Sequence, residues 1–430
     1  MAIRIIIEED AERQVEMTLE PEHHDDKEWE EVCYQLGCAV AMEIAKRWLF
    51  SIEERLYQEH PKSIEVEGFR ERARETRFGK LDIQRRLYRD DQGEYHFLLD
   101  EHLSWPAYRR ATPDLTESLV DSSTRASFRE VTRDEKYSTV TVSRSTVHRL
   151  VQEVAKTAIR VERKEWEACF EEGSLPPSGS GKASVLYTEA DGLWLHTQRE
   201  SQKHCELKNA ITYEGWERLP QKEERYRLVN KKVYCQSDSS IPFWEGIGLL
   251  WHKYWDLAYT DLIVLGGDDS EWIDSGVDEL GSSCIRQLSG FHLARSCRRG
   301  WEKGKELYDV IRCGDIQHTL GDYGEREGKT AQKAREYVVK RLEKGRDWRK
   351  KVSDTALASK IPEDARGLGA IEGNEFHLFA DRMKDRGMSW TIAGARHMGK
   401  VIELAANGDL KRWCGRNPPD EQKQCLSFDL

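Results

Sequence analysis

The chain has 430 residues and a formal net charge of −11; 38% of its residues are hydrophobic and 34% are charged. At about 100–200 residues per domain, this length allows about two to four domains with sizeable cores. Its apolar runs are too short for a membrane span, which needs about 20 consecutive apolar residues. No export signal precedes the first charged residues, so we expect a cytoplasmic protein with reduced cysteines.

The negative charge is concentrated at the N-terminus. Residues 1–31 hold 12 acidic and 3 basic residues, a composition that predicts a mobile acidic tail. The rest of the chain is close to neutral. The total charge therefore does not exclude nucleic acid, because such a partner needs only a local basic surface.

Residues 32–171 are predicted to form a helical region with one hairpin. Apolar residues recur three to five apart over Trp29–Gln58, which predicts a long helix. Two β-prone runs, Phe78–Tyr88 and Tyr95–Leu99, flank a turn signal and predict a β-hairpin. Further helices are predicted at Leu115–Lys136 and Arg144–Ala158.

The segment from Ala126 to Glu153 has the pattern of a helix-turn-helix. Ser127 begins a first helix, Thr139–Val142 carries the turn, and Ser143 caps a second helix. Such a second helix can enter the major groove of DNA. An ordinary helical hairpin explains the pattern equally well. The candidate DNA-binding side chains are Arg144, Thr146, His148 and Arg149.

A linker rich in Pro, Gly and Ser is predicted at residues 172–182. Beyond it we expect an α/β domain over residues 183–410, with an all-α insertion at about 290–366, and a C-terminal tail over 411–430. The expected fold class is α/β and multidomain. Strands are predicted at Ala183–Asp191, Leu193–Thr197, Cys205–Tyr213, Lys232–Cys235 and Asp261–Leu265, and helices at Pro242–Leu257, Ala370–Arg386 and Thr391–Ala406.

Three acidic residues occupy positions that suit a metal site. Asp191 ends a predicted strand, Asp268 follows a buried strand, and Glu372 opens a helix. Ligand groups gather at the carboxyl ends of strands in α/β sheets, and Mg²⁺ takes oxygen ligands from a few carboxylates. Each acid also has an ordinary explanation as a turn or cap residue. Their order, one acid after each of two strands and a third on a helix, is the layout of an RNase H-like two-metal nuclease core. The acids are 77 and 104 residues apart, and the predicted helical insertion fills the longer gap.

A basic segment lies within the predicted insertion. Residues 329–351 hold 10 basic and 3 acidic residues. Arg341, Lys344 and Arg346 are candidate phosphate contacts, and a solvated helix face is the alternative. Trp348 and Trp390, which lie near basic residues, are further candidates for contact with DNA.

An ordered set of stretches over about residues 30–405 resembles the ISLre-type insertion-sequence transposases, DDE transposases related to the mutator-like group. The stretches include Phe78–Tyr88, Gly93–Asp100, Val142–His148, Glu189–Gly192, Tyr213–Trp216, Gly266–Asp268, Phe291–Leu293, Ala370–Asn374 and Met383–Trp390. The resemblance implies an RNase H-like domain in which Asp191, Asp268 and Glu372 are catalytic and hold two Mg²⁺ or Mn²⁺ ions. It also implies transposon ends and target DNA as partners, and a homo-oligomer on DNA.

Two positions depart from the family pattern. Where the family has Gly-Asp-Gly-Ala, this chain has Gly267–Ser270, so Asp269 is a rival to Asp268. Where the family has Leu-Asp-x-Phe-His, Ser289 replaces the Asp. His292, in the same motif, is a candidate to support the catalytic residues.

The function predicted from the sequence is metal-dependent cleavage and strand transfer of an insertion sequence. One alternative is a catalytically decayed, transposase-derived protein that only binds DNA, which the departures at Ser289 and Asp269 motivate. The other is an RNase H-like nuclease that cuts without joining.

Overall fold

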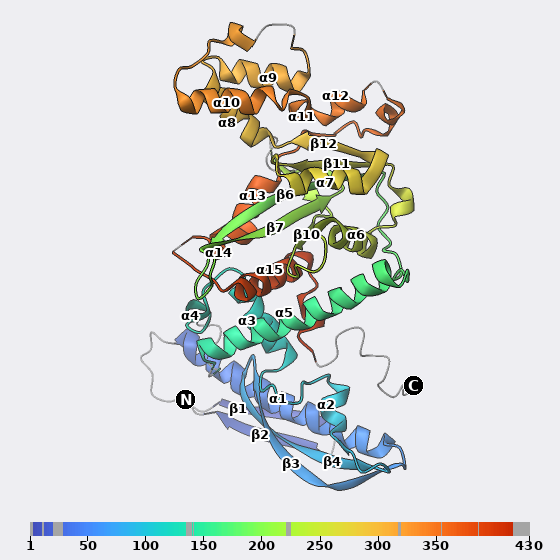
Figure 1. Cartoon of the computed structure of the whole chain (residues 1–430). Helices are drawn as coiled ribbons and strands as arrows, with labels where there is room; N and C mark the ends of the chain where they lie inside the picture. Colours follow the sequence, from blue (N-terminus) through green and yellow to red (C-terminus); the bar gives the residue numbers. More distant parts are fainter. Residues whose placement is uncertain are drawn as a thin grey trace. The chain divides into compact units, whose positions relative to one another are not determined.

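The computed structural model describes residues 3–10, 13–19, 29–134, 140, 142–220, 225–316, 320–353, 355–385 and 387–415. The chain forms two compact units, Met1–Leu150 with Lys411–Leu430 and Val151–Leu410. Their border falls inside helix α5 (Arg144–Trp166), upstream of the predicted linker (Figure 1).

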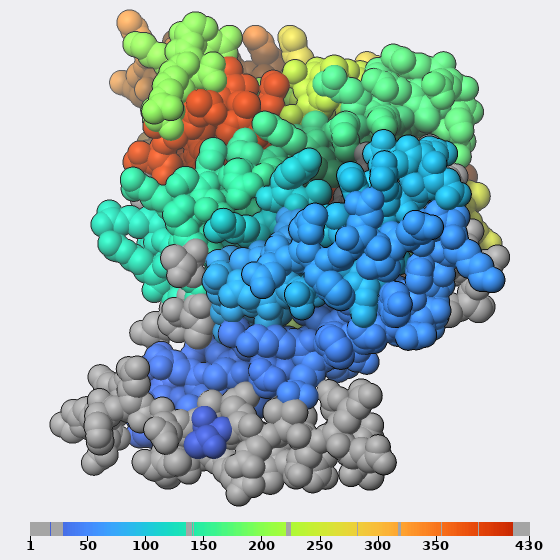
Figure 2. Space-filling view, turned by 90° about the horizontal axis from the view of Figure 1, so that it is seen from below, coloured from blue at the N-terminus to red at the C-terminus, as the bar shows by residue number. Residues whose placement is uncertain are grey.

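The first unit joins a long helix to a three-stranded sheet. Helix α1 (Trp29–Glu59) confirms the predicted helix and packs Leu49 and Ile52 against the core of the unit. Strand β4 (Gly79–Asp90) supplies Leu81 and Ile83 to that core. In the space-filling view, α1 and the sheet form one continuous blue surface (Figure 2).

The hairpin of this unit differs from the predicted one. The main partner of β4 is β3 (Ile64–Thr76), which was not predicted. The predicted strand Tyr95–Leu99 was too long, because only β5 (Tyr95–His96) pairs with β4 and helix α2 (Leu98–His102) follows at once. Residues within the predicted acidic tail form a further antiparallel pair, β1 (Ile3–Asp10) and β2 (Arg13–Leu19).

Short capped helices precede α5. Thr112 accepts a hydrogen bond from the Leu115 N–H at the start of α3 (Pro113–Ser123), and Ser127 forms a capping box at the start of α4 (Phe128–Val131). The Ser143 hydroxyl accepts from the Thr146 N–H at 3.2 Å, the cap expected for α5. The first helix of the predicted helix-turn-helix is thus a single turn, and part of its predicted turn lies outside the described residues.

A five-stranded mixed sheet forms the centre of the second unit, in the order β10-β7-β6-β11-β12. Strands β6 (Val185–His196), β7 (His204–Tyr213) and β10 (Lys232–Cys235) pair antiparallel. Strands β11 (Leu262–Gly267) and β12 (Cys284–Leu288) run parallel to β6. A separate hairpin, β8 (Gly215–Arg218) and β9 (Tyr226–Val229), lies between β7 and β10 in the sequence.

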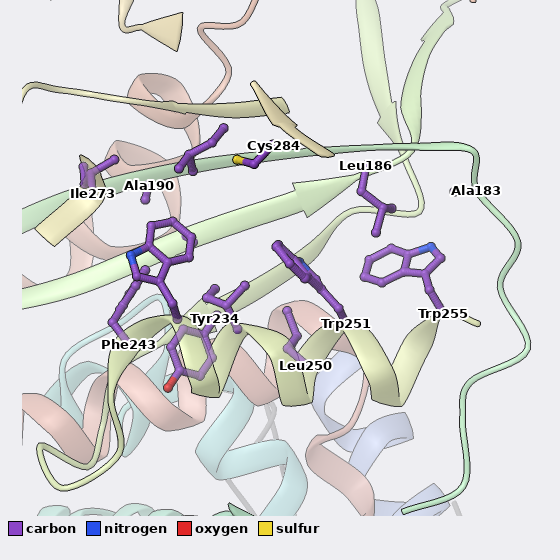
Figure 3. Packing of buried hydrophobic residues seen from close by; sticks show 14 residues of the cluster. Ala183, Leu186, Ala190, Tyr234, Phe243, Leu250, Trp251, Trp255, Ile273 and Cys284 are labelled. Carbon is purple, nitrogen blue, oxygen red and sulfur yellow. The ribbon is translucent and has the colours of Figure 1, made fainter. Parts of the chain in front are cut away.

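Both faces of this sheet carry aromatic side chains. Helix α6 (Phe243–Tyr254) directs Trp251 toward the sheet, where Trp255 and Leu186 join the same core (Figure 3). Helix α7 (Glu271–Leu280) adds Ile273 to this core. On the other side, Tyr187 packs against Trp348, with ring centroids 5.5 Å apart. Because Trp348 is fully buried, its predicted contact with DNA was wrong.

The predicted insertion is helical. Between residues 290 and 366, the described part contains no strand of the sheet. Its first helices enclose a separate small core that includes Leu293, Trp301 and Ile311. The helices are α8 (Gly290–Gly300), α9 (Gly304–Cys313), α10 (Lys329–Val339), α11 (Leu342–Gly345) and α12 (Trp348–Val352).

The unit closes with two predicted helical regions. The first is broken into α13 (Ile371–Glu375), a π-helical turn (Phe376–Ala380) and α14 (Asp381–Met383). The second is α15 (Ile392–Asn407), which Thr391 caps at its N-terminus. None of the helices in the described ranges is long and apolar enough to cross a membrane.

Candidate active site

The parallel pairing of the three strands β6, β11 and β12 ends at one level. Gly267, the last residue of β11, pairs with Ala190 of β6 on one side and with Leu288 of β12 on the other. Gly267 has a φ of +153°, and a Cβ atom there would lie 2.6 Å from the Ala190 carbonyl oxygen, so glycine allows the close approach of the strands. The next residues along the three strands are Asp191, Asp268 and Ser289.

Asp191 was predicted to end its strand, and that detail was wrong. Strand β6 continues to His196 because its antiparallel pairing with β7 goes on after the parallel pairing with β11 has ended. Asp191 nevertheless lies at the carboxyl edge of the parallel part, where ligand groups of α/β sheets gather.

Glu372 of α13 is held beside this edge. The Ser289 hydroxyl donates a hydrogen bond to Glu372 Oε1 at 3.0 Å, and His292 Nε2 lies 3.5 Å from the same oxygen. Burial and the charge of Asp191 raise the pKa of Glu372, and the hydrogen bond from Ser289 opposes that rise. Ser289 and His292 therefore both support the third predicted acid.

A fully buried carboxylate, Glu189, fixes the start of α13 against β6. It accepts hydrogen bonds from the Tyr213 hydroxyl at 2.7 Å and from the backbone N–H groups of Ala370 and Ile371 at 3.0 and 3.3 Å. Burial raises its pKa. Because Glu189 lies two residues before Asp191 on the same strand, it ties Glu372 to the strand that carries Asp191.

The three predicted acids line one pocket of about 710 Å³. The carboxylates around it are Asp191, Glu206, Asp268, Glu271, Glu372 and Glu375, and Lys384 lies among them. Burial, a hydrogen bond with Asp191 and the charges of Asp191 and Glu372 raise the pKa of Glu375 to about 9. Burial and the charge of Asp268 likewise raise the pKa of Glu206. The pocket therefore holds more carboxylate charge than the surrounding protein neutralises.

Sequence reasoning missed Glu375 and Glu206. Glu375 lies three residues after Glu372, a spacing that places both on one face of a helix, so it could have been found. Glu206 sits inside a strand, directly opposite Trp194, and no motif marks it.

The donor set fits a divalent cation such as Mg²⁺, which prefers carboxylate oxygens. The surplus negative charge of the pocket adds to this fit. In the described parts of the chain, no three His, Cys, Asp or Glu side chains converge closely enough to hold a metal ion. Asp191, Asp268, Glu372 and Glu375 line the same pocket, and their carboxylates would have to move closer together to hold one.

Asp269, the rival of Asp268, faces other partners. It forms an ion pair with Arg341 and another with Lys344, whose Nζ is 3.1 Å away. Burial raises the pKa of Asp269, but the hydrogen bonds from Arg341 and Lys344 outweigh it, and the pKa is lowered. Asp268 lines the pocket and Asp269 does not.

The predicted DNA-binding residues occupy two separate elements. At the start of α5, Arg144, His148 and Arg149 are exposed and Thr146 is half-buried. Arg341 and Lys344 are engaged by Asp269, Lys344 is also paired with Asp274, and Arg346 is half-buried. Other basic residues of the same segment are exposed: Lys329, Lys333, Lys340 and Lys350.

Comparison with known proteins places the chain in a family. A relative from Streptococcus gallolyticus, the "UPF0236 protein in vanSb 3'region", is 27% identical over 347 residues, which cover 77% of this chain and 72% of the relative. Residues 26–416 match the family described as "Uncharacterised protein family (UPF0236)". Because that match spans most of the chain, this protein belongs to the UPF0236 family.

Proposed function

We propose that this protein is a DDE-type DNA transposase whose second unit is an RNase H-like catalytic domain. The observation that carries the proposal is the alignment of Asp191, Asp268 and Ser289 directly after the last parallel pairs of three neighbouring strands, with Glu372 hydrogen-bonded to Ser289. Two carboxylates from neighbouring strands and one from a helix then face a common pocket. This arrangement suits a reaction at a phosphodiester bond.

The topology of the sheet supports the same proposal. Three antiparallel strands are followed by two strands parallel to the first, and the all-α block precedes the helix that carries Glu372. Since one fold hosts many activities, the fold adds weight only together with the site. The resemblance to ISLre-type transposases, with transposon ends and target DNA as partners of a homo-oligomer, points to the same reaction.

In this proposal, Asp191, Asp268 and Glu372 would hold two divalent cations. Bound cations at such a site activate water and stabilise the leaving oxygen of the cleaved phosphodiester. Glu189 holds the start of α13 in place, and Ser289 orients the Glu372 carboxylate. No protein nucleophile is needed, because water and then the freed 3′-hydroxyl attack phosphorus.

The test uses the purified full chain, Mg²⁺ and DNA that carries both flanks of its gene. The wild type should cut at the flanks and join the ends to target DNA. Asp191→Asn should abolish both steps and leave DNA binding intact. Asp278→Asn, which changes an exposed acid on α7, is the matched control.

Each outcome has a separate meaning. Normal cutting by Asp191→Asn would contradict the proposal. Cutting without joining by the wild type would identify a nuclease. Binding without cutting, with activity gained in Ser289→Asp, would identify a decayed enzyme whose defect lies at that residue.

A further inference from the structure

Two exposed aromatic side chains stand at the rim of the carboxylate pocket. Trp194 of β6 is 57% exposed and Phe291 of α8 is 54% exposed. Of the exposed large hydrophobic residues in the described parts of the chain, these two line the pocket. Apolar side chains left in water add nothing to the stability of a carboxylate pocket, and two of them at one pocket offer their ring faces to a ligand.

Both aromatic residues sit on elements that carry the site. Trp194 lies three residues after Asp191 and pairs with Glu206 in the β6–β7 ladder. Phe291 packs edge-on against the ring of His292, with centroids 5.5 Å apart, and His292 contacts Glu372. A flat ligand group on either ring would therefore lie within the reach of the catalytic carboxylates.

Lys384 gives the rim its positive charge. It is exposed, lines the same pocket and acts electrostatically on Glu375. A lysine beside two exposed aromatic rings offers a phosphate contact and stacking faces together. That combination is the one by which proteins hold single-stranded nucleic acid.

We propose that Trp194 and Phe291 stack on unpaired bases of the DNA strand to be cut, while Lys384 contacts a neighbouring phosphate. The bases of an intact duplex are stacked on each other and cannot offer their faces to these rings. The preferred substrate is then DNA that is locally melted at the pocket. This inference rests on the proposed function for the assignment of the pocket to DNA.

The proposal is tested by binding alone, without divalent cations, so that cleavage plays no part. Labelled oligonucleotides of one sequence are compared by fluorescence anisotropy as a single strand, as a duplex and as a duplex with a central mismatched bubble. The wild type should bind the bubble and the single strand more tightly than the duplex. Trp194→Ala and Phe291→Ala should each weaken binding to the bubble by about tenfold, with little change for the duplex.

Two further variants keep the test sharp. Tyr259→Ala removes another aromatic residue, 50% exposed, which precedes β11 at the end opposite Asp268, and it should bind all three DNAs like the wild type. Trp194→Phe keeps an aromatic face and should recover most of the lost affinity. The affinity of Trp194→Phe for the bubble also shows whether weak binding by Trp194→Ala comes from the lost aromatic face or from a misfolded chain.

A fluorescent base analogue reports the stacking itself. 2-Aminopurine placed in the bubble should lose fluorescence on binding the wild type and keep it with Trp194→Ala. The inference would be overturned if Trp194→Ala and Phe291→Ala lost equal affinity for the bubble and the duplex, or lost none. It would also be overturned if these residues contacted another protein and affected the binding of none of the three DNAs.

The outcomes separate this inference from the proposed function. If the wild type discriminates the bubble through Trp194 but never cuts DNA, the stacking site stands and the transposase proposal fails. If the wild type cuts and joins DNA while Trp194→Ala and Phe291→Ala bind and cut normally, only the stacking site fails.

Discussion

The two units of this protein treat surplus charge in opposite ways. In the first unit, Asp100 pairs with the buried Arg74 and Arg85 at 2.9 and 2.5 Å, and with Arg72 at 3.4 Å. The surplus positive charge is taken up inside the protein, since Arg74 also donates to the carbonyl oxygens of Pro106 and Arg109. Its guanidinium carbon lies 4.7 Å from the centroid of the Trp105 ring.

In the second unit, six carboxylates and one lysine are among the described residues that line a pocket open to solvent. The described groups around the pocket do not balance that charge, and the pKa of Glu375 rises to about 9 because of burial and its carboxylate neighbours. The two clusters use charge in two ways. Charges with protein partners hold the fold together, and charges left open to solvent are available to a ligand.

Breaking the closed cluster should have the largest effect on stability. Asp100→Ala leaves Arg74 and Arg85 buried without their carboxylate, so it should lower the free energy of unfolding by ~3–5 kcal/mol in chemical denaturation. Asp191→Asn removes a repelling charge from the pocket and should leave that free energy unchanged or raise it. Similar losses in both variants would contradict the comparison.

The open cluster should respond to a cation. Mg²⁺ at about 100 times its dissociation constant should add about 2.7 kcal/mol to the free energy of unfolding, because it binds the folded chain. Thermal unfolding with and without Mg²⁺ measures this gain. The double variant Asp191→Asn/Asp268→Asn should lose the gain, and the control Asp278→Asn should keep it.

A buried triad in the second unit offers a pH test of the same idea. Lys400 lies 2.8 Å from Glu162 and 2.9 Å from Glu403. One cation faces two carboxylates, and burial raises the pKa of Glu403 from 4.5 to about 7, although Lys400 opposes the rise. Between these two pH values, the folded chain keeps a proton that the unfolded chain releases.

Stability should therefore fall as pH rises through that window, by up to ~1.4 kcal/mol per pH unit, and level off above it. Glu403→Gln should flatten this part of the curve of unfolding free energy against pH. A wild-type curve that rises across the window would show that Lys400 keeps Glu403 ionised.

The smallest expected effect concerns the basic segment of the insertion. Because Arg341 and Lys344 are paired with Asp269, their replacement should hardly change the salt dependence of DNA binding. Replacing the exposed Lys329, Lys333 and Lys340 with Ala should reduce the slope of log affinity against log salt by about 0.9 for each lost phosphate contact. If neither set of replacements changed the slope, the basic segment would be a solvated surface that does not contact DNA.

Part of the fold could be predicted because apolar spacing marked it. Helix α1 and strands β7, β10 and β11 follow their predicted bounds closely. Strand β12 was not predicted because two of its five residues, Arg286 and Gln287, are polar yet buried. Their partners come from distant segments: Arg286 donates to Asp274 and Gln287 accepts from the Trp348 N–H. No local pattern reveals such pairings.

The acids of the site were predicted where a residue stands at the end of a predicted strand, follows one or opens a predicted helix. Asp191, Asp268 and Glu372 carry that signal, and the structure brings all three to one pocket. Glu189 carries none, since a carboxylate inside a strand is normally exposed. Its role depends on the backbone N–H groups of a helix that begins 182 residues later.

The hydrogen bonds of Glu189 have one consequence for the evolution of this chain. The cap at the start of α13 fixes Glu372 directly to β6, so the geometry of the pocket does not depend on the length of chain between Asp268 and Glu372. Lengthening a connection costs little, about 0.6 kcal/mol for each doubling. The connections within the helical block can therefore change in length while the carboxylates keep their positions, as long as His292 keeps its contact with Glu372 and Trp348 keeps its place against Tyr187.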